Sequence, residues 1–324
     1  MLTADYYING ILQKDRVVLS KAITIIESTK PEDNLLAEKI IQACLQTNRS
    51  SRRIGITGAP GAGKSTFINA FGKLLLEEKN SIAVLAIDPS STISRGSILG
   101  DKTRMEDISN HPGCYIRPTA SSSTMGGVAR KTRETITLCE TFGFDYIFIE
   151  TVGVGQSETM VKNMVDLFLL LLLPNSGDEL QGIKRGIMEM ADMVIIHKSD
   201  KANEAAAKTA AAQIKLALHL LAPNEKNWTI PVMNVSSLEH TGLEECRQKL
   251  DSYFLQMENS GFLSHNRTHQ QIHALEEHVI ELLKSKLHSD PGILQLKTEL
   301  EQRIIRREMD VSSAAKLLSE KLLR

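Results

Sequence analysis

Residues 54–66 restrict the possible folds of this 324-residue chain more than any other stretch, because they contain the pattern G-x-x-x-x-G-K-S. The apolar residues Ile54 and Ile56 precede the pattern as a strand would, and apolar residues recur at helical spacing after it. Between a strand and a helix, such glycines let backbone N–H groups point toward phosphate oxygens, and the helix start adds partial positive charge. We therefore expect a phosphate-binding loop formed by Gly58, Ala59, Pro60, Gly61, Ala62, Gly63, Lys64, Ser65 and Thr66.

Two side chains of this loop have separate roles. In loops of this pattern the lysine reaches the β- and γ-phosphates of a nucleotide, and the hydroxyl that follows it binds Mg²⁺. We assign these roles to Lys64 and Ser65. The ligands predicted by the loop are therefore a nucleoside triphosphate and Mg²⁺.

Strand-like and helix-like segments alternate from residue 53 to about residue 257. The runs typical of strands are 53–57, 82–87, 114–117, 145–150, 166–173, 192–197 and 231–235. The helical patterns between them are 64–79, 127–142, 180–190, 202–221 and 241–257. This alternation predicts an α/β fold with a mainly parallel sheet flanked by helices. Together with the phosphate loop, it indicates the P-loop NTPase class. Ligands of such sheets bind at the carboxyl ends of the strands.

Helical patterns without strands flank this alternating region at both ends. One lies within residues 1–50, and the other covers about 265–287, 290–307 and 311–323. We therefore predict three parts. They are an N-terminal helical extension at 1–50, a P-loop domain at 51–260 and a C-terminal helical arm at 261–324.

Three carboxylates follow strands or lie in loops of the predicted sheet. Asp88 follows the run 82–87, Asp101 lies in the next loop, and Glu150 ends the run 145–150. The sequence from Glu150 to Gly153 has the shape of the D-x-x-G element that senses a γ-phosphate, with Glu in place of Asp. Carboxylates at separate loops suit a hydrated Mg²⁺. We assign catalysis to Lys64, Asp101 and Glu150, and metal binding to Ser65, Asp88, Asp101 and Glu150.

The strand-like run 192–197 ends in His197-Lys198-Ser199-Asp200, where GTPases carry N-K-x-D. In that motif the Asp accepts hydrogen bonds from guanine N1 and N2, and the Lys stem covers the ring. Ser236 follows the last strand, where the base loop of G proteins often carries Ser-Ala. Lys198, Asp200 and Ser236 therefore favour guanine over adenine, because a buried acceptor for N1 and N2 discriminates strongly. His197 replaces the usual Asn and leaves relaxed or ATP-preferring binding as an alternative.

The residue after the D-x-x-G glycine indicates how fast the site hydrolyses its nucleotide. Ras-like GTPases place a water-orienting Gln there. This chain has Val154 at that position, and Gln156 lies two residues further on. We therefore expect slow intrinsic hydrolysis that a partner could raise.

Composition argues against several other classes of function. A net charge of −1 and an aromatic content of 4% disfavour nucleic acid and anionic membrane as partners. The four cysteines lack C-x-x-C spacing, and the N-terminus has neither a signal-peptide nor a transit-peptide pattern. We expect a cytoplasmic protein with reduced thiols.

Three histidines, His265, His269 and His273, recur every four residues and would share one face of a helix. Such a face could bind a metal, but the stretch is polar and no cysteine lies nearby. We favour surface histidines and keep the metal site as an alternative.

Several motifs together resemble the MeaB/ArgK family, the G-protein chaperones associated with methylmalonyl-CoA mutase. They are GAPGAGKST at 58–66, IDPSS at 87–91, GSILGDKTRM at 96–105, GGVARKT at 126–132, ETVGVGQSE at 150–158 and GDELQGIK at 177–184. The combination is much more specific than any one of these motifs. The looser resemblance covers roughly residues 10–257.

The resemblance implies a SIMIBI-like G domain with a C-terminal dimerisation arm, and hence a homodimer. It implies GTP hydrolysis, with Mg²⁺, coupled to loading and protection of an adenosylcobalamin-dependent acyl-CoA mutase. By matched position, Lys64 binds phosphates, Ser65 ligates Mg²⁺, and Lys198 and Asp200 hold the base. Asp88, Asp101 and Glu150 complete the metal and water shell. The stretch 177–184 resembles the mobile loop that relays the nucleotide state to the mutase.

Two other functions are compatible with the same fold. A nickel-enzyme maturation GTPase usually carries Cys/His metal motifs, and this chain has no His-rich or C-x-x-C segment near its N-terminus. A transport-linked P-loop ATPase or kinase would need an acceptor pocket or a membrane partner, which no motif marks. Competition between GTP and ATP separates this last class from the GTPases.

Overall fold

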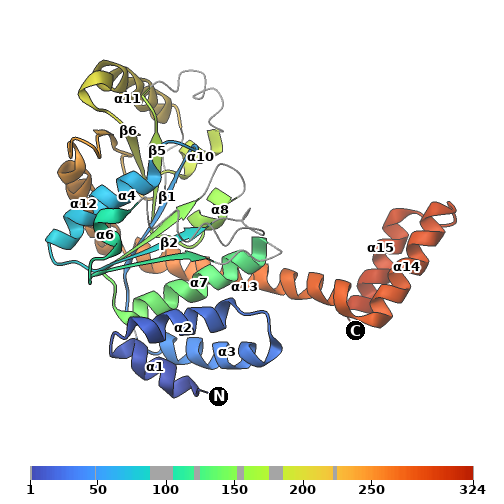
Figure 1. Ribbon diagram of the computed structural model, residues 1–324. Helices are drawn as coiled ribbons and strands as arrows, with labels where there is room; N and C mark the ends of the chain where they lie inside the picture. The colour runs from blue at the N-terminus through green and yellow to red at the C-terminus, as the bar shows by residue number, and fades with distance from the viewer. Residues whose placement is uncertain are drawn as a thin grey trace. The chain divides into compact units, whose positions relative to one another are not determined.

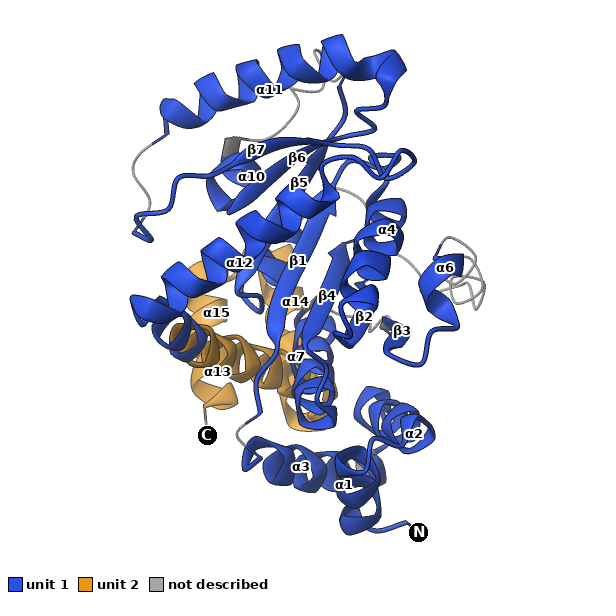
Figure 2. Cartoon of the chain, turned by 90° about the vertical axis from the view of Figure 1, so that its left-hand side faces the viewer, with its two compact units in different colours: residues 1–268 blue, residues 269–324 orange. Residues whose placement is uncertain are grey.

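The computed structural model of the protein describes residues 2–47, 49–87, 105–119, 125–151, 157–174, 185–221 and 225–323. The chain divides into two compact units, residues 1–268 and residues 269–324, which Figure 2 shows in different colours. The first unit contains the sheet and the N-terminal helices. The second contains most of the C-terminal helical region.

The sheet of the first unit is parallel and has the strand order β3-β2-β4-β1-β5-β6-β7 among the described residues (Figure 2). Its strands are β1 Arg52–Gly58, β2 Ile82–Ile87, β3 Cys114–Thr119, β4 Tyr146–Thr151, β5 Leu167–Leu172, β6 Met193–His197 and β7 Val232–Val235. This architecture confirms the predicted α/β class with a parallel sheet. The order places β1 in the middle, between β4 and β5, so the loop after β1 lies at the centre of the carboxyl edge.

Helices cover both faces of this sheet. They are α4 Lys64–Glu77, α6 Glu106–Ser109, α7 Met125–Phe142, α8 Ser157–Lys162, α10 Arg185–Met190, α11 Glu204–His219 and α12 Leu243–Asn259, with the 3₁₀ turn η1 Lys201–Asn203. Helices α4 and α12 pack on one face, where Phe71 and Phe254 meet Phe148 of β4 in one apolar cluster. Helices α7 and α8 pack on the other face against the alternate strand residues, such as Ile147 and Ile149. Successive strand side chains point to opposite faces of the sheet, and helices cover both faces. Every residue of β4 is therefore buried.

The N-terminal helices α1 Ala4–Leu12, α2 Arg16–Glu27 and α3 Pro31–Leu45 belong to the same unit as the sheet. Asp15 caps α2 by accepting hydrogen bonds from the backbone N–H groups of Val17 and Val18. Helices α2 and α3 lie along α7 (Figure 1), and Leu19 and Ile40 are fully buried in the apolar cluster that contains residues of α7. These helices thus add a further layer outside α7.

The C-terminal helices are α13 Phe262–Ser289, α14 Pro291–Ile305 and α15 Val311–Leu322. Within the second unit, α14 packs on α15 through Ile293, Leu300 and Ala314, which are buried. Asp290 and Asp310 cap the two helices through the backbone N–H groups of Ile293 and Ser313. None of the helices in the described part of the chain is both long enough and apolar enough to cross a membrane.

Candidate nucleotide-binding site

The phosphate loop connects β1 to α4, as its sequence predicts. Gly61 and Gly63 have φ angles of +82° and +89°, which L side chains rarely adopt. A Cβ atom at Gly58 would lie 2.4 Å from the carbonyl oxygen of Leu171, and one at Gly63 would lie 2.6 Å from Nδ1 of His197. The glycines therefore allow the loop to turn tightly against β5 and β6.

Lys64 begins α4 and folds back over the loop. Its ammonium group donates hydrogen bonds to the carbonyl oxygens of Gly58, at 2.7 Å, and Ala59, at 3.2 Å. Burial lowers the pKa of Lys64, and the negative charges of Glu150 and Glu158 partly offset that effect. The ammonium group thus lies at the loop itself, where it can reach phosphate oxygens.

Ser65 and Glu150 bring oxygen atoms together beside the loop. The Ser65 hydroxyl donates a 2.9 Å hydrogen bond to Oε1 of Glu150, which is 5% exposed. Glu150 lies near the end of β4, opposite Ile56 of β1. A hydroxyl and a carboxylate side by side are oxygen ligands that suit Mg²⁺, so these residues fit the metal predicted from the sequence.

Other predicted residues of the catalytic region lie outside the described residues. They are Asp88, Asp101, Val154, Gln156 and the stretch 177–184. Their assignments stay predictions.

The K-x-D loop after β6 has a defined local geometry. Lys198 adopts a φ of +58°, and its carbonyl oxygen accepts a 3.1 Å hydrogen bond from the Asn203 side chain. The Asp200 carboxylate accepts a hydrogen bond from the Ser236 hydroxyl, which in turn accepts one from the backbone N–H of Glu239. Ser236 is therefore placed against Asp200, where it orients the carboxylate that would read guanine.

His197 connects the two loops. Its Nδ1 lies 2.7 Å from the carbonyl oxygen of Ala62 in the phosphate loop, and its Nε2 lies 2.7 Å from Oγ of Ser237. The side chain is buried, and burial lowers its pKa. The sequence indicated only that an Asn was replaced here. The second serine after β7, Ser237, was not selected by sequence reasoning, although its place beside Ser236 offered a signal.

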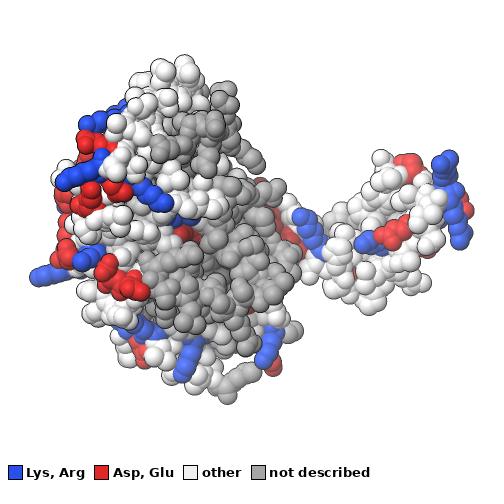
Figure 3. All heavy atoms as spheres, turned by 45° about the horizontal axis from the view of Figure 1, so that its top comes forward, with Lys and Arg blue, Asp and Glu red and all other residues white. Residues whose placement is uncertain are grey.

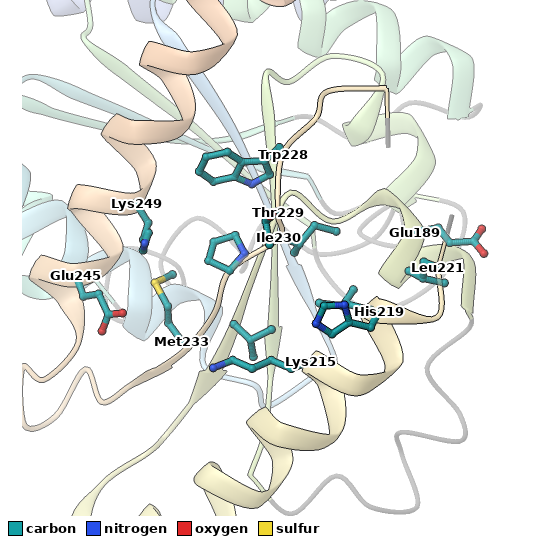
Figure 4. Close-up of a pocket in the computed structure, with 13 residues that line it drawn as sticks. Glu189, Lys215, His219, Leu221, Trp228, Thr229, Ile230, Met233, Glu245 and Lys249 are labelled. Atoms are coloured by element: carbon teal, nitrogen blue, oxygen red, sulfur yellow. The ribbon is translucent and has the colours of Figure 1, made fainter. Parts of the chain in front are cut away.

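A separate hollow of about 990 Å³ lies between α11, α12 and the segment that leads into β7 (Figure 4). Its lining includes Trp228, Pro231, Lys215 and Lys249. No lining residue belongs to the phosphate loop or the K-x-D loop, and the lining segment precedes the carboxyl end of β7. The nucleotide site is therefore assigned from the two loops and not from the hollow.

Charge does not mark a separate binding face in the view of Figure 3. Lysine and arginine side chains lie among aspartate and glutamate side chains over the described atoms of that face. This mixture agrees with the net charge of −1. The charged groups that we assign to nucleotide binding are those of the phosphate loop and the K-x-D loop.

The fold and the two loops define a P-loop GTPase. The family model described as "Methylmalonyl Co-A mutase-associated GTPase MeaB" matches residues 19–292, and the chain belongs to this family. The resemblance seen in the sequence is thereby confirmed, as is the assignment to GTP-hydrolysing enzymes.

The relatives agree with this family. A probable GTPase of Mycobacterium bovis is 42% identical over 98% of this chain and 95% of its own length. The mouse protein named "Methylmalonic aciduria type A homolog, mitochondrial" is 42% identical over 97% of this chain and 78% of its own length. A solved structure titled "Crystal structure of LAO/AO transport system kinase" has a TM-score of 0.79 and 31% identity, covering 99% of this chain and 98% of that one.

Proposed function

We propose that this GTPase gates the loading of adenosylcobalamin into a cobalamin-dependent acyl-CoA mutase, methylmalonyl-CoA mutase, and protects the loaded enzyme. The observation that carries the proposal is the family match over residues 19–292, which includes both nucleotide loops. The description of that family names the mutase. The name of the mouse relative refers to methylmalonic aciduria.

The nucleotide site supplies the switch in this proposal. Lys64 holds the phosphates, Lys198 and Asp200 hold guanine, and Ser236 orients Asp200. Ser65 and Glu150, which share a hydrogen bond, would hold Mg²⁺ together with Asp88 and Asp101. The metal would neutralise charge on the phosphate oxygens. Val154 stands in place of the water-orienting Gln and makes intrinsic GTP hydrolysis slow. The mutase can therefore control the rate of hydrolysis.

We further propose that the protein acts as a homodimer through its C-terminal region. Within the second unit, α13 exposes an apolar stripe whose members are spaced by three, four and three residues. They are Ile272, Leu275, Val279 and Leu282, each about half exposed. This spacing is typical of helices that pair along an apolar seam, so a second copy of the chain is the occupant that we assign.

Light scattering tests the dimer. The variant Leu275→Glu places a charge in the stripe and should give a monomer, because an unpaired charge does not enter an apolar seam. Ile305→Glu changes an exposed residue of α14 outside the stripe and should keep the mass of the wild type. A monomeric wild type, or a dimeric Leu275→Glu variant, would refute this interface.

Purified methylmalonyl-CoA mutase tests whether this enzyme is the partner of the GTPase. We expect the mutase to bind this protein in at least one nucleotide state and to raise its GTP turnover, while Lys64→Met abolishes the turnover. Transfer of adenosylcobalamin to the mutase should then depend on the nucleotide. If calorimetry detects no binding with GDP, with a GTP analogue or without nucleotide, the mutase assignment fails and the GTPase assignment remains.

The same calorimeter compares guanine with adenine nucleotides. Tighter binding of a GTP analogue than of an ATP analogue supports the GTPase switch over a transport-linked ATPase or kinase. For the nickel alternative, the described residues hold no group of three or more His, Cys, Asp or Glu side chains arranged to bind a metal ion. No structural observation on those residues therefore favours that second function.

A further inference from the structure

The side chain of His197 touches both nucleotide loops at once. One ring nitrogen, Nδ1, lies 2.7 Å from the carbonyl oxygen of Ala62, four residues after the phosphate loop begins. The other, Nε2, lies 2.7 Å from the hydroxyl of Ser237, next to the serine that orients Asp200. The imidazole thus spans the distance between the phosphate end and the base end of the site.

The two contacts fix which nitrogen carries the proton. A carbonyl oxygen only accepts hydrogen bonds, so Nδ1–H donates to Ala62. Burial favours the neutral ring, in which Nε2 keeps a lone pair and accepts a hydrogen bond from the Ser237 hydroxyl. The ring therefore acts as a donor on one side and an acceptor on the other, and the side-chain amide of Asn offers the same combination.

Packing prevents the ring from moving independently of the phosphate loop. His197 is 2% exposed, and its ring meets that of Phe67 edge-on at 6.1 Å between centroids. The backbone of Gly63 lies so close that any Cβ there would come within 2.6 Å of Nδ1. Lys198 and Asp200 lie one and three residues after His197 in the chain. A shift of the K-x-D loop would therefore move the His197 ring against the phosphate loop.

We propose that His197 and Ser237 form a positioning pair that fixes the spacing between the base-binding and phosphate-binding loops. This inference rests on the guanine nucleotide site proposed above. A ligand that engages both loops gains from a spacing that is set before binding. A ligand that engages only the phosphate loop gains little from it.

Calorimetry with GDP and with inorganic pyrophosphate, both with Mg²⁺, separates these two cases. We expect His197→Ala to weaken GDP binding about tenfold or more, which corresponds to about 1.4 kcal/mol, and to change pyrophosphate binding by less than about threefold. His197→Asn keeps a donor and an acceptor and should restore GDP affinity to within about threefold of the wild type. Ser237→Ala should weaken GDP binding and leave pyrophosphate binding unchanged.

The control variant is His219→Ala, because His219 lines the distant hollow beside α11 and should not affect either ligand. Unchanged GDP affinity in His197→Ala would overturn the proposal. An equal loss of GDP and pyrophosphate would also overturn it, because it would show a local role in the phosphate loop. If His197→Ala does not fold, full GDP affinity in Ser237→Ala overturns the pair. A wild type that binds pyrophosphate but not GDP would overturn the guanine site itself, and the pair with it.

Discussion

The Ser65 hydroxyl donates a 2.9 Å hydrogen bond to Oε1 of Glu150. This contact joins the first turn of α4 to the carboxyl end of β4, two elements that are 85 residues apart in the sequence. In P-loop NTPases, hydrolysis takes place at a phosphate loop of this kind. The contact therefore places a carboxylate where the charge of Mg²⁺ and of the phosphates would be greatest.

The first prediction concerns the charge of Glu150. Glu150→Gln keeps an oxygen that can accept from Ser65 but removes the negative charge. We expect kcat for GTP to fall about 10²-fold or more, with a smaller change in GDP affinity, because the charge acts mainly in hydrolysis. Steady-state phosphate release measures this, with Glu77→Gln, an exposed position of α4, as the control. Equal kcat in both variants would contradict the role.

The second prediction concerns the ammonium group of Lys64. Lys64→Met preserves most of the buried stem and removes the charge that lies over the loop carbonyls. We expect GDP affinity to fall about 10²-fold, or about 2.7 kcal/mol, because the charge-assisted hydrogen bonds to phosphate are lost. Calorimetry measures the affinity. Lys73→Met, an exposed lysine of the same helix, should bind GDP as the wild type does.

The sheet could be predicted from the sequence because its strands are buried on both faces. The run 82–87 coincides with β2, and the run 166–173 differs from β5 by one residue at each end. Two short helices, α6 and α8, were not predicted. They have four and six residues, too few to show a helical period, and they are held by burial of residues such as Ile108 and Val161.

The site could be predicted only as far as local motifs extend. The phosphate loop and the K-x-D loop are contiguous in sequence, so their spacing identifies them. The contact from His197 to Ala62 joins residues that are 135 positions apart, and no local motif shows that these two residues meet in the fold. The same holds for Ser237, whose place depends on how the turn after β7 meets β6.

The third prediction concerns base selection by Asp200. Asp200→Asn replaces an acceptor of the guanine N1–H and N2–H groups with an amide. We expect GDP affinity to fall by more than about 10²-fold, because a polar group of the base is left without its partner. Xanthosine diphosphate has a carbonyl oxygen at position 2 and should now bind better than GDP. Competition binding measures both, and exposed Lys201→Ala is the control.

The fourth prediction is a pH dependence that belongs to His197. Burial is the largest cause that lowers its pKa below the ordinary 6.5; Lys198 adds to this, and Asp200 and the bond to Ala62 oppose it. The unfolded chain therefore takes up this proton at higher pH than the folded protein does. The stability due to neutral His197 is complete above about pH 6.5 and is lost as the pH falls through the folded pKa. The Tm of the wild type should fall more steeply than that of His197→Asn as the pH is lowered from 7.5 to 5. Parallel Tm curves would contradict this.

The fifth prediction concerns the buried carboxylate of Asp166, at the opposite end of the sheet from the nucleotide loops. Arg267 of α13 donates to both of its oxygens, at 2.8 Å and 2.6 Å, and the Asp166 side chain has no exposed surface. Arg267→Met leaves this charge with the backbone N–H of Arg53 as a remaining donor. We expect the free energy of unfolding of the first unit to fall by about 3 kcal/mol, because a buried charge loses its counter-charge.

Urea unfolding followed by tryptophan fluorescence measures this loss, because Trp228 reports on the first unit. The double variant Arg267→Met/Asp166→Asn should recover part of it, since neutralising the carboxylate removes the uncompensated charge. Exposed Lys249→Met in α12 serves as the control and should change stability by less than about 0.5 kcal/mol. If the double variant were less stable than Arg267→Met alone, the loss would come from the other contacts of the arginine, namely its stem packing and its hydrogen bonds to Ser50 and Ser51, and not from the buried charge.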